Sequence, residues 1–284
     1  MLICQLTDLH VCAVGMTANR VSETNMFAIR AFRAVAAMSP RPDVVLITGD
    51  LTESGLPAEY ANLAALLRQY LPVTTYVIPG NHDRRDNLRR QLAHLPGVNA
   101  DPEYVQFTVD DHPVRLVMLD TLVPGFGHGE LRDSQLEWLD RTLAAVPDKP
   151  TLIGMHHPPF ACGIVHMDKI ALRNIEAFTA VIARHAQVRR IICGHHHRPI
   201  FTQVAGAIAS ISPSVAHQVE LTFDPADKGA FNFEPPAFHL HRWTAAGGIV
   251  THTAYVEDFP GPYPFVATPN YPGKAAWSPE PRSA

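Results

Sequence analysis

The sequence predicts an α/β fold built on a mostly parallel sheet, and three features of its first half support this. Short runs rich in Val, Ile, Leu and Thr recur along the chain, at 2–7, 43–48 and 73–78. Between them lie longer segments whose apolar residues repeat every three or four positions, as on one face of a helix. The resulting alternation of strands and helices is typical of parallel strands joined by covering helices.

The helices of this half have recognisable limits. The first is predicted over 22–38, where an apolar stripe ends at Ser39-Pro40. Pro57 suits the first position of the second helix, because proline lacks only an N–H that would be unpaired there. A third helix is predicted over 84–95, after the strand at 73–78.

The second half begins with a predicted hairpin and ends in a different pattern. Its first elements are expected to be strands at 104–109 and 114–119, a helix at 133–146, a strand at 151–156, a helix at 168–185 and a strand at 188–193. Alternating polar and apolar residues then predict an antiparallel second sheet. Its segments are 200–205, 207–212, 216–223, 238–243 and 249–256, with a loop at 224–236.

The composition limits the class of protein. With 284 residues, 46% of them hydrophobic, the chain can bury the core of one large domain, which we expect to span 1–256. A net charge of −4 argues against a broad nucleic-acid-binding surface. No apolar run approaches the roughly 20 residues that cross a bilayer. The chain begins directly with a predicted strand and its four cysteines form no CxxC pair, so we expect a cytoplasmic protein without a disulfide framework or membrane contact.

The segment 257–284 differs from the rest. It holds seven prolines, which oppose regular secondary structure, and five aromatic residues, which a disordered linker usually lacks. We expect an extended arm docked on the protein surface or on another subunit, so a homo-oligomer is possible. A frayed terminus is the alternative, most strongly after Ser278.

Chemically active side chains follow the predicted strands. Because the carboxyl ends of parallel strands meet at one edge of a sheet, we expect these residues to converge. Oxygen and imidazole donors without thiolates suit Mn²⁺, Fe or Zn²⁺. The alternative, a set of hydrogen-bonded structural residues, would bury many polar groups at considerable cost. The predicted ligands of a two-metal site are Asp8, His10, Asp50, Asn81, His156, His195 and His197.

Spacing supports this prediction. In Asp8-x-His10 and His195-x-His197, residues two apart on an extended segment point the same way, so both can reach one site. Glycines beside the ligands permit close backbone paths, and these are Gly49, Gly80 and Gly194.

These motifs resemble those of the calcineurin-like metallophosphoesterases. That family's pattern is Asp-x-His, Gly-Asp, Gly-Asn-His-Asp/Glu, His and Gly-His-x-His, and every part occurs in this order across residues 8–197. The resemblance is closest to the bacterial branch of glycerophosphodiesterases and class III cyclic-nucleotide phosphodiesterases. It implies a four-layer α/β/β/α sandwich of two mixed β-sheets around a binuclear metal centre.

The resemblance also implies roles for single residues. The first metal would be held by Asp8, His10, Asp50 and His197, and the second by Asp50, Asn81, His156 and His195. His156 is preferred over its neighbour His157 as the ligand. His82 would face the phosphate and be held by Asp83, and both are predicted to be catalytic. His217 is a further candidate for contact with the substrate.

The expected reaction is hydrolysis of a small phosphodiester, by in-line attack of a hydroxide held between two divalent ions. Two such ions, the carboxylates of Asp8 and Asp50, and one hydroxide leave about one positive charge, which suits a monoanionic diester. Glycerophosphodiesters and cyclic nucleotides are the candidate substrates. The alternatives are a phosphomonoesterase with the same site and a non-catalytic binding scaffold, which would be expected to have lost ligands.

Overall fold

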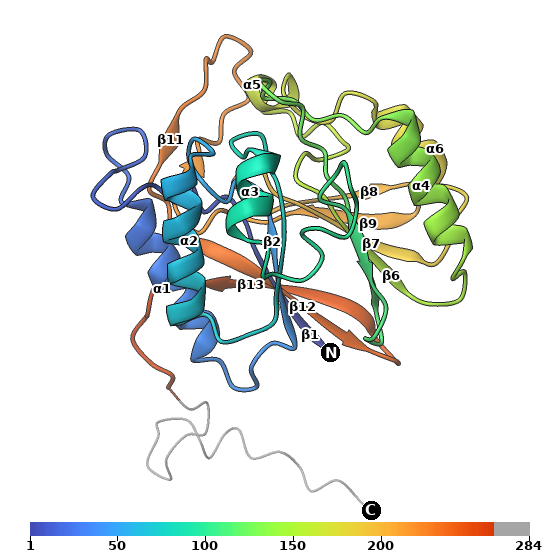
Figure 1. Ribbon diagram of the computed structural model, residues 1–284, viewed down its shortest axis with the longest axis horizontal. Helices are drawn as coiled ribbons and strands as arrows, with labels where there is room; N and C mark the ends of the chain where they lie inside the picture. Colours follow the sequence, from blue (N-terminus) through green and yellow to red (C-terminus); the bar gives the residue numbers. More distant parts are fainter. Residues whose placement is uncertain (264–284) are drawn as a thin grey trace, which may run out of the picture.

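The computed structural model describes residues 1–263, and its first large sheet follows the predicted βαβαβ order (Figure 1). Its strands are β1 (Leu2–Leu6), β2 (Val44–Thr48), β3 (Thr75–Ile78), β12 (Ala237–Thr244) and β13 (Gly248–Tyr255), in the order β13-β12-β1-β2-β3. The strands β1, β2 and β3 are parallel, as the sequence predicts. The strands β12 and β13 join this sheet antiparallel, beside β1.

The second large sheet has six strands. They are β4 (Phe107–Val109), β5 (Arg115–Met118), β6 (Thr151–Gly154), β7 (Val188–Cys193), β8 (Ile200–Val204) and β9 (Ala207–Ile211), in the order β4-β5-β6-β7-β9-β8. The predicted hairpin of β4 and β5 is confirmed, and β5, β6, β7 and β9 run parallel. The register therefore brings the carboxyl ends of β6 and β7 to one edge.

Helices cover the outer face of each sheet, which gives four layers (Figure 1). The first sheet carries α1 (Thr24–Ala36), α2 (Pro57–Tyr70) and α3 (Arg85–Gln91), and the second carries α4 (Asp133–Ala144) and α6 (Ile175–Ile182). A third apolar cluster lies between the sheets and includes Leu46, Ile78, Leu116 and Ile192. The expected α/β/β/α sandwich is confirmed.

The predicted helix at 168–185 is wrong in its first half. The short helix α5 (Val165–Asp168) ends where that helix was expected to begin, and α6 starts only at Ile175. The backbone between them bonds to other segments, since Leu172 N–H donates to Pro158 O at 3.3 Å and Arg173 N–H to Gly129 O at 2.9 Å. Those tertiary bonds replace the ones that a continuous helix would make.

The predicted separate antiparallel sheet after residue 200 is also wrong. Its strands extend the two large sheets, with β8 and β9 beside β7 and β12 and β13 beside β1. Only β10 (Gln218–Val219) and β11 (Phe231–Asn232) form a small ribbon of their own, within the segments predicted as a strand and a loop. Alternating residues indicate which face of a strand is buried, but they do not identify its partner.

The structure bears on the expectations about disulfides and membrane-crossing segments, but not on most of the predicted C-terminal arm. All four cysteines lie in the described chain and are free. Among residues 1–263, no helix is long and apolar enough to cross a bilayer. The predicted arm falls mostly on residues 264–284, which lie outside the described residues.

A polar layer lies between the sheets, beside the apolar cluster. His241 bonds through its ring nitrogens to Thr251 Oγ1 at 2.9 Å and to Gln5 Oε1 at 3.1 Å. His239 is fully buried, and neither of its ring nitrogens has a hydrogen-bond partner within residues 1–263. Burial, with a smaller effect of the Arg190 guanidinium, lowers the pKa of His239 to about 4. The folded protein therefore favours the neutral form of the His239 imidazole.

This layer should make the fold sensitive to acid. The pKa of His239 is lower in the folded than in the unfolded chain, so the unfolded chain binds more protons between about pH 6.5 and 4. The free energy of unfolding should therefore decrease as the pH is lowered, by about 2 kcal/mol between pH 7 and pH 5 for this group alone. The measurement is urea unfolding of wild type and His239→Phe at both pH values. The variant should lose less stability than wild type, and equal losses would contradict the prediction.

Candidate metal centre

The predicted ligands converge at the carboxyl ends of five strands. Asp8 and His10 follow β1, Asp50 follows β2 and Asn81 follows β3, while His156 follows β6 and the pair His195 and His197 follows β7. The residues come from both sheets, so the site lies across the edge where the two sheets meet. All except Asn81 are buried.

One group of four donors surrounds a common point. Asp8, His10, Asp50 and His197 each offer one ligand atom, and these atoms all lie within 4.8 Å of one another. His197 Nε2 lies 3.2 Å from Asp8 Oδ1 and 3.3 Å from His10 Nε2. His10 Nε2 also lies 3.7 Å from Asp50 Oδ2.

A second group adjoins the first through Asp50. Asp50 Oδ2 lies 3.4 Å from His156 Nε2, which in turn lies 3.2 Å from the amide oxygen of Asn81. The ring of His195 is centred 5.1 Å from that of His156. Asp50 is thus the carboxylate that faces both groups, as the resemblance implies.

Hydrogen bonds fix which nitrogen of each histidine faces the site. In four rings, one nitrogen lies against an acceptor oxygen and donates its proton to it, so in the neutral ring the other nitrogen presents a lone pair to the site. These bonds join His10 Nδ1 to Glu53 Oε2 at 2.8 Å, His156 Nδ1 to Thr48 O at 2.8 Å, His197 Nδ1 to His217 O at 2.8 Å and His195 Nε2 to Ile170 O at 3.0 Å.

The inward-facing atoms fit a divalent cation. The Nε2 atoms of His10 and His197 face each other at 3.3 Å, and His156 Nε2 faces the Asn81 oxygen at 3.2 Å. Each is a meeting of two acceptors, and an added proton could bridge only one such pair at a time. A cation satisfies several at once. Imidazole nitrogens and oxygens are ligands that Mn²⁺, Fe and Zn²⁺ accept.

The charges of the site also favour a divalent cation. Burial alone would raise the pKa of Asp50, but His156 and His82 outweigh it and hold that pKa well below its usual value. Burial likewise lowers the pKa of His156, yet Asp50 raises it to about 9. The buried carboxylate is therefore held in its ionised form, which is the form that binds metal.

The backbone at the site is strained. Five of the seven residues are non-glycine residues with left-handed φ, which costs on the order of 1–3 kcal/mol each and is typical of functional sites. Their φ angles are 53° at Asp8, 47° at His10, 46° at Asp50, 74° at His195 and 54° at His197. The prediction that Asp8-x-His10 and His195-x-His197 are extended is therefore wrong. Left-handed turns, not strand alternation, direct these side chains to one point.

The glycines act as predicted. A Cβ on Gly80 would lie 2.7 Å from His156 Nε2, and one on Gly194 would lie 2.8 Å from Asp8 Oδ2. At Gly49 it would meet the His156 side chain at 2.9 Å or less. Each glycine therefore leaves the space that a ligand occupies.

His82 lies beside the first group, as predicted. Its ring centre is 4.7 Å from that of His10, and its backbone N–H donates to Asp50 Oδ1 at 2.9 Å. Its Nδ1 donates to Glu53 O at 2.6 Å, which leaves Nε2 free to act. Burial lowers its pKa, but Asp50 and the Glu53 carbonyl outweigh this and raise it.

Asp83 does not hold His82, so that prediction is wrong. The buried carboxylate accepts four hydrogen bonds from other groups: Leu51 N–H at 3.0 Å, Gly80 N–H at 2.9 Å, Tyr60 O–H at 2.8 Å and Thr52 O–H at 3.2 Å. Asp83 instead holds together the loops after β2 and β3. It positions ligands from a distance and does not reach the cavity.

His217 lies at the site, as predicted. Its ring centre is 4.9 Å from that of His197 and 5.3 Å from that of His10. Burial, followed by the neighbouring histidines His197 and His10, lowers its pKa to about 2. A neutral ring at the cavity wall can contact substrate without adding charge.

The remaining histidines near the site are engaged elsewhere. His157 uses both ring nitrogens, with Thr121 Oγ1 at 2.7 Å and Gly127 O at 3.2 Å, which supports His156 as the ligand. His196, between the two ligand positions of its motif, is fully buried, and its Nδ1 lies 3.4 Å from Cys162 Sγ.

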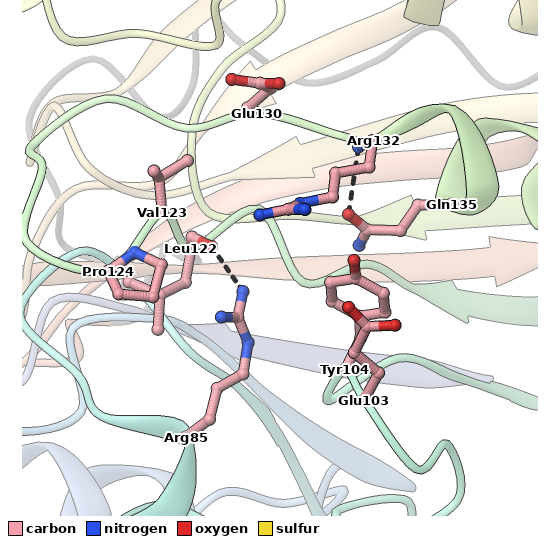
Figure 2. A pocket seen from close by; sticks show the side chains of 9 residues that line it. All are labelled: Arg85, Glu103, Tyr104, Leu122, Val123, Pro124, Glu130, Arg132 and Gln135. Atoms are coloured by element: carbon pink, nitrogen blue, oxygen red, sulfur yellow. Dashed lines mark hydrogen bonds between the residues drawn. The ribbon is translucent and has the colours of Figure 1, made fainter.

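Arg85, which follows the Gly80–Asp83 loop, is engaged in a buried ion pair outside the metal centre. Figure 2 shows its guanidinium reaching the wall of a separate cavity of about 130 Å³. It forms two bonds to the buried carboxylate of Asp120, at 2.6 and 2.8 Å, and one to Leu122 O. The pairing ties the loop after β3 to the one after β5. Arg198 similarly pairs with Glu234 at 2.8 Å.

Sequence reasoning missed Glu53. Its carboxylate fixes His10 and its carbonyl fixes His82, so one residue orients two rings of the site. Its place three residues after Asp50 on a polar loop was the only available signal. A hydrogen bond to the outer nitrogen of a ligand histidine cannot be read from spacing.

Removing this support should weaken metal binding. We expect Glu53→Ala to lower metal affinity about 10- to 100-fold, the usual effect of losing the group behind a ligand histidine. Glu53→Gln should lose less, because the amide oxygen can still accept from His10 Nδ1. Competition with a chelator measures the affinities, and Glu137→Ala, at a side chain 71% exposed, is the control. Unchanged affinity in Glu53→Ala would refute this role.

Comparison with known proteins places the chain among phosphoesterases. Residues 1–199 match the family model described as calcineurin-like phosphoesterase. The chain is 34% identical over 266 residues to a probable glycerophosphodiester phosphodiesterase GpdQ of Arcobacter nitrofigilis, covering 93% of this chain and 97% of that relative. It is 31% identical to a 3′,5′-cyclic-nucleotide phosphodiesterase of Nostoc, covering 94% and 95%.

A solved structure supports the fold. A dimetal phosphatase from Danio rerio matches 90% of this chain and 99% of its own, with a TM-score of 0.62 and 16% identity. A further relative by sequence is the 3′,5′-cyclic adenosine monophosphate phosphodiesterase CpdA of Vibrio vulnificus. It is 31% identical, and the match covers 87% of each chain. With a family model across residues 1–199 and relatives above 30% identity along most of its length, the chain belongs to the calcineurin-like phosphoesterase family.

Proposed function

We propose that this protein is a metal-dependent phosphodiesterase that hydrolyses small phosphodiesters. The observation that carries the proposal is the position of Asp50, a carboxylate 2% exposed, between two groups of inward-facing donors at the wall of an open cavity. Relatives that match this chain over most of their length are named as glycerophosphodiester and cyclic-nucleotide phosphodiesterases.

Two ions would share the seven ligands. We assign Asp8, His10, Asp50 and His197 to the first ion, and Asp50, Asn81, His156 and His195 to the second, with Mn, Fe or Zn as the metals. When bound, such a pair supplies an acidified water and neutralises charge on the phosphoryl group. Four free thiols fit a reducing compartment, so we propose the cytoplasm.

The charge of the cavity favours a diester. Its volume is about 460 Å³, and among the described residues that line it there is no lysine or arginine. Positive charge beyond the ions would come from His82, whose pKa is raised. The positive charge of the cavity would therefore balance a monoanionic diester more fully than a dianionic monoester. His82 Nε2 can donate its proton to a phosphoryl oxygen or to the departing alcohol.

His82→Ala should slow turnover while leaving the metals in place. We expect kcat to fall about 100-fold, because a positioned proton donor typically contributes at least that much. Metal content should stay at the wild-type value, since His82 adjoins His10 but is not among the assigned ligands. Steady-state kinetics with elemental analysis checks both, and His94→Ala serves as an exposed control. A wild-type kcat would remove His82 from the reaction.

The direct test compares an aryl diester with its monoester. Metal-free protein is reloaded with Mn²⁺, Fe²⁺ or Zn²⁺ and assayed with bis(4-nitrophenyl) phosphate and 4-nitrophenyl phosphate. We expect metal-dependent hydrolysis with kcat/KM higher for the diester. Faster hydrolysis of the monoester would indicate a phosphomonoesterase. Two bound metal equivalents without any hydrolysis would indicate the non-catalytic scaffold.

A further inference from the structure

The cavity has two unlike halves. One is the metal centre with His82 and His217, which would take the phosphodiester group. The other half is largely apolar and belongs to α5, the segment after it and the β10–β11 ribbon. Its apolar side chains are Met167, Ile170, Val219 and Phe231. A substrate whose phosphate reaches the metals can place the rest of itself against this wall.

The apolar wall is anchored in the fold. Val219 pairs directly with Phe231 across the ribbon, and it packs with Met167 and Ile164 in a small core. The ring of Phe231 packs edge to face on that of Phe233, at 6.0 Å between centres. The wall is therefore preformed, so a ligand that packs on it need not order it.

Phe231 adjoins the metal centre through His217. Its ring centre is 4.8 Å from that of His217, which in turn lies 4.9 Å from that of His197. Both Phe231 and the ligand His197 line the same cavity. A substrate with its phosphate at the metal centre and a flat ring in its leaving group can therefore bring that ring to Phe231.

The apolar side chains of the wall offer no hydrogen-bond partner to a polar leaving group. The polar side chains in this half are His166, whose Nδ1 lies 3.0 Å from Asp227 Oδ2, and Asn19. Glycerol hydroxyls placed against the apolar side chains would lose water without a replacement. A nucleobase instead has an apolar face that can pack on Phe231.

We infer that Phe231 is a specificity-determining residue that stacks on the nucleobase of a cyclic nucleotide, which makes nucleoside cyclic phosphates the preferred substrate class. This inference rests on the proposed phosphodiesterase function and selects among its candidate substrates. Stacking of a base on an aromatic side chain contributes about 1–3 kcal/mol. Loss of the ring should therefore cost about tenfold, which corresponds to about 1.4 kcal/mol.

The experiment compares 3′,5′-cyclic AMP with glycerophosphoethanolamine. Wild type should show the higher kcat/KM with cyclic AMP. Phe231→Leu, which keeps apolar volume but removes the ring, should lower that value about tenfold, mainly through KM, and change the other substrate less than twofold. Phe231→Tyr should restore it. Phe223→Leu, at an exposed phenylalanine outside the cavity, should change neither.

Binding of adenosine 5′-monophosphate separates the two proposals. Calorimetry on the metal-loaded proteins should show about tenfold weaker binding to Phe231→Leu. Equal binding by wild type and variant, or equal loss with both substrates, would overturn the inference while leaving the phosphodiesterase proposal intact. If wild type hydrolyses neither substrate nor the aryl diester, the proposed function fails, and weaker nucleotide binding by the variant would still support the role of Phe231.

Discussion

Asp50→Asn is expected to lower turnover on the order of 10³-fold and to reduce the bound metal to one equivalent or less. Asp50 Oδ2 lies 3.7 Å from His10 Nε2 and 3.4 Å from His156 Nε2, so one charge serves both donor groups. An amide of the same shape keeps the packing but removes that charge. Losing several kcal/mol of charge stabilisation corresponds to about three powers of ten in rate.

The fold of this variant should survive. Asp8 and Asp50 are buried near each other, and Asp50 acts to raise the pKa of Asp8. Neutralising Asp50 relieves that repulsion but also removes the attraction to His156 and His82 that holds its own pKa low, so the metal-free variant should stay folded and melt below metal-free wild type. Elemental analysis, kinetics and calorimetry measure the three quantities, with Asp111→Asn, at a side chain 77% exposed, as control. Two full metal equivalents with wild-type turnover would exclude the bridging role.

The fold was largely predictable because its first half is built from local contacts. The strands β1, β2 and β3 alternate with helices that carry clear apolar stripes, and that order implies a parallel sheet. The partners of the later strands were not predictable. The strand β12 pairs with β1 across most of the sequence, for example Gln5 with His239. Only the completed sheets show which edges remain free.

The convergence of the proposed ligands was predictable, but the geometry that produces it was not. The proposed ligands follow strand ends and were selected by residue type and position. The left-handed backbone at Asp8 and Asp50 could not be found in this way, because aspartate at a strand end is equally compatible with an extended chain. Glu53 and Asp83 act through hydrogen bonds to other loops. Such roles depend on contacts that exist only after the loops converge.

Asp83→Ala should cause the largest loss of stability, about 3–5 kcal/mol at pH 8. Burial, followed by the charge of Asp50, raises the pKa of Asp83 to about 6, so the folded protein disfavours the charge; at pH 8 the carboxylate is nevertheless ionised, and its hydrogen bonds offset that cost. It then accepts four buried hydrogen bonds, from Leu51, Gly80, Thr52 and Tyr60. Removing a buried charged group leaves its partners unpaired, which costs several kcal/mol.

Tyr60→Phe provides the matched comparison. It removes one of the four donors to the carboxylate and also the acceptor of the Arg84 N–H at 2.9 Å, while the carboxylate stays in place, so it should cost about 2 kcal/mol. Urea unfolding of the metal-free proteins measures both losses without a contribution from metal binding. If Asp83→Ala lost no more stability than Tyr60→Phe, the carboxylate would not be joining the loops after β2 and β3. The strained ligand positions would then have to be held by the strands alone.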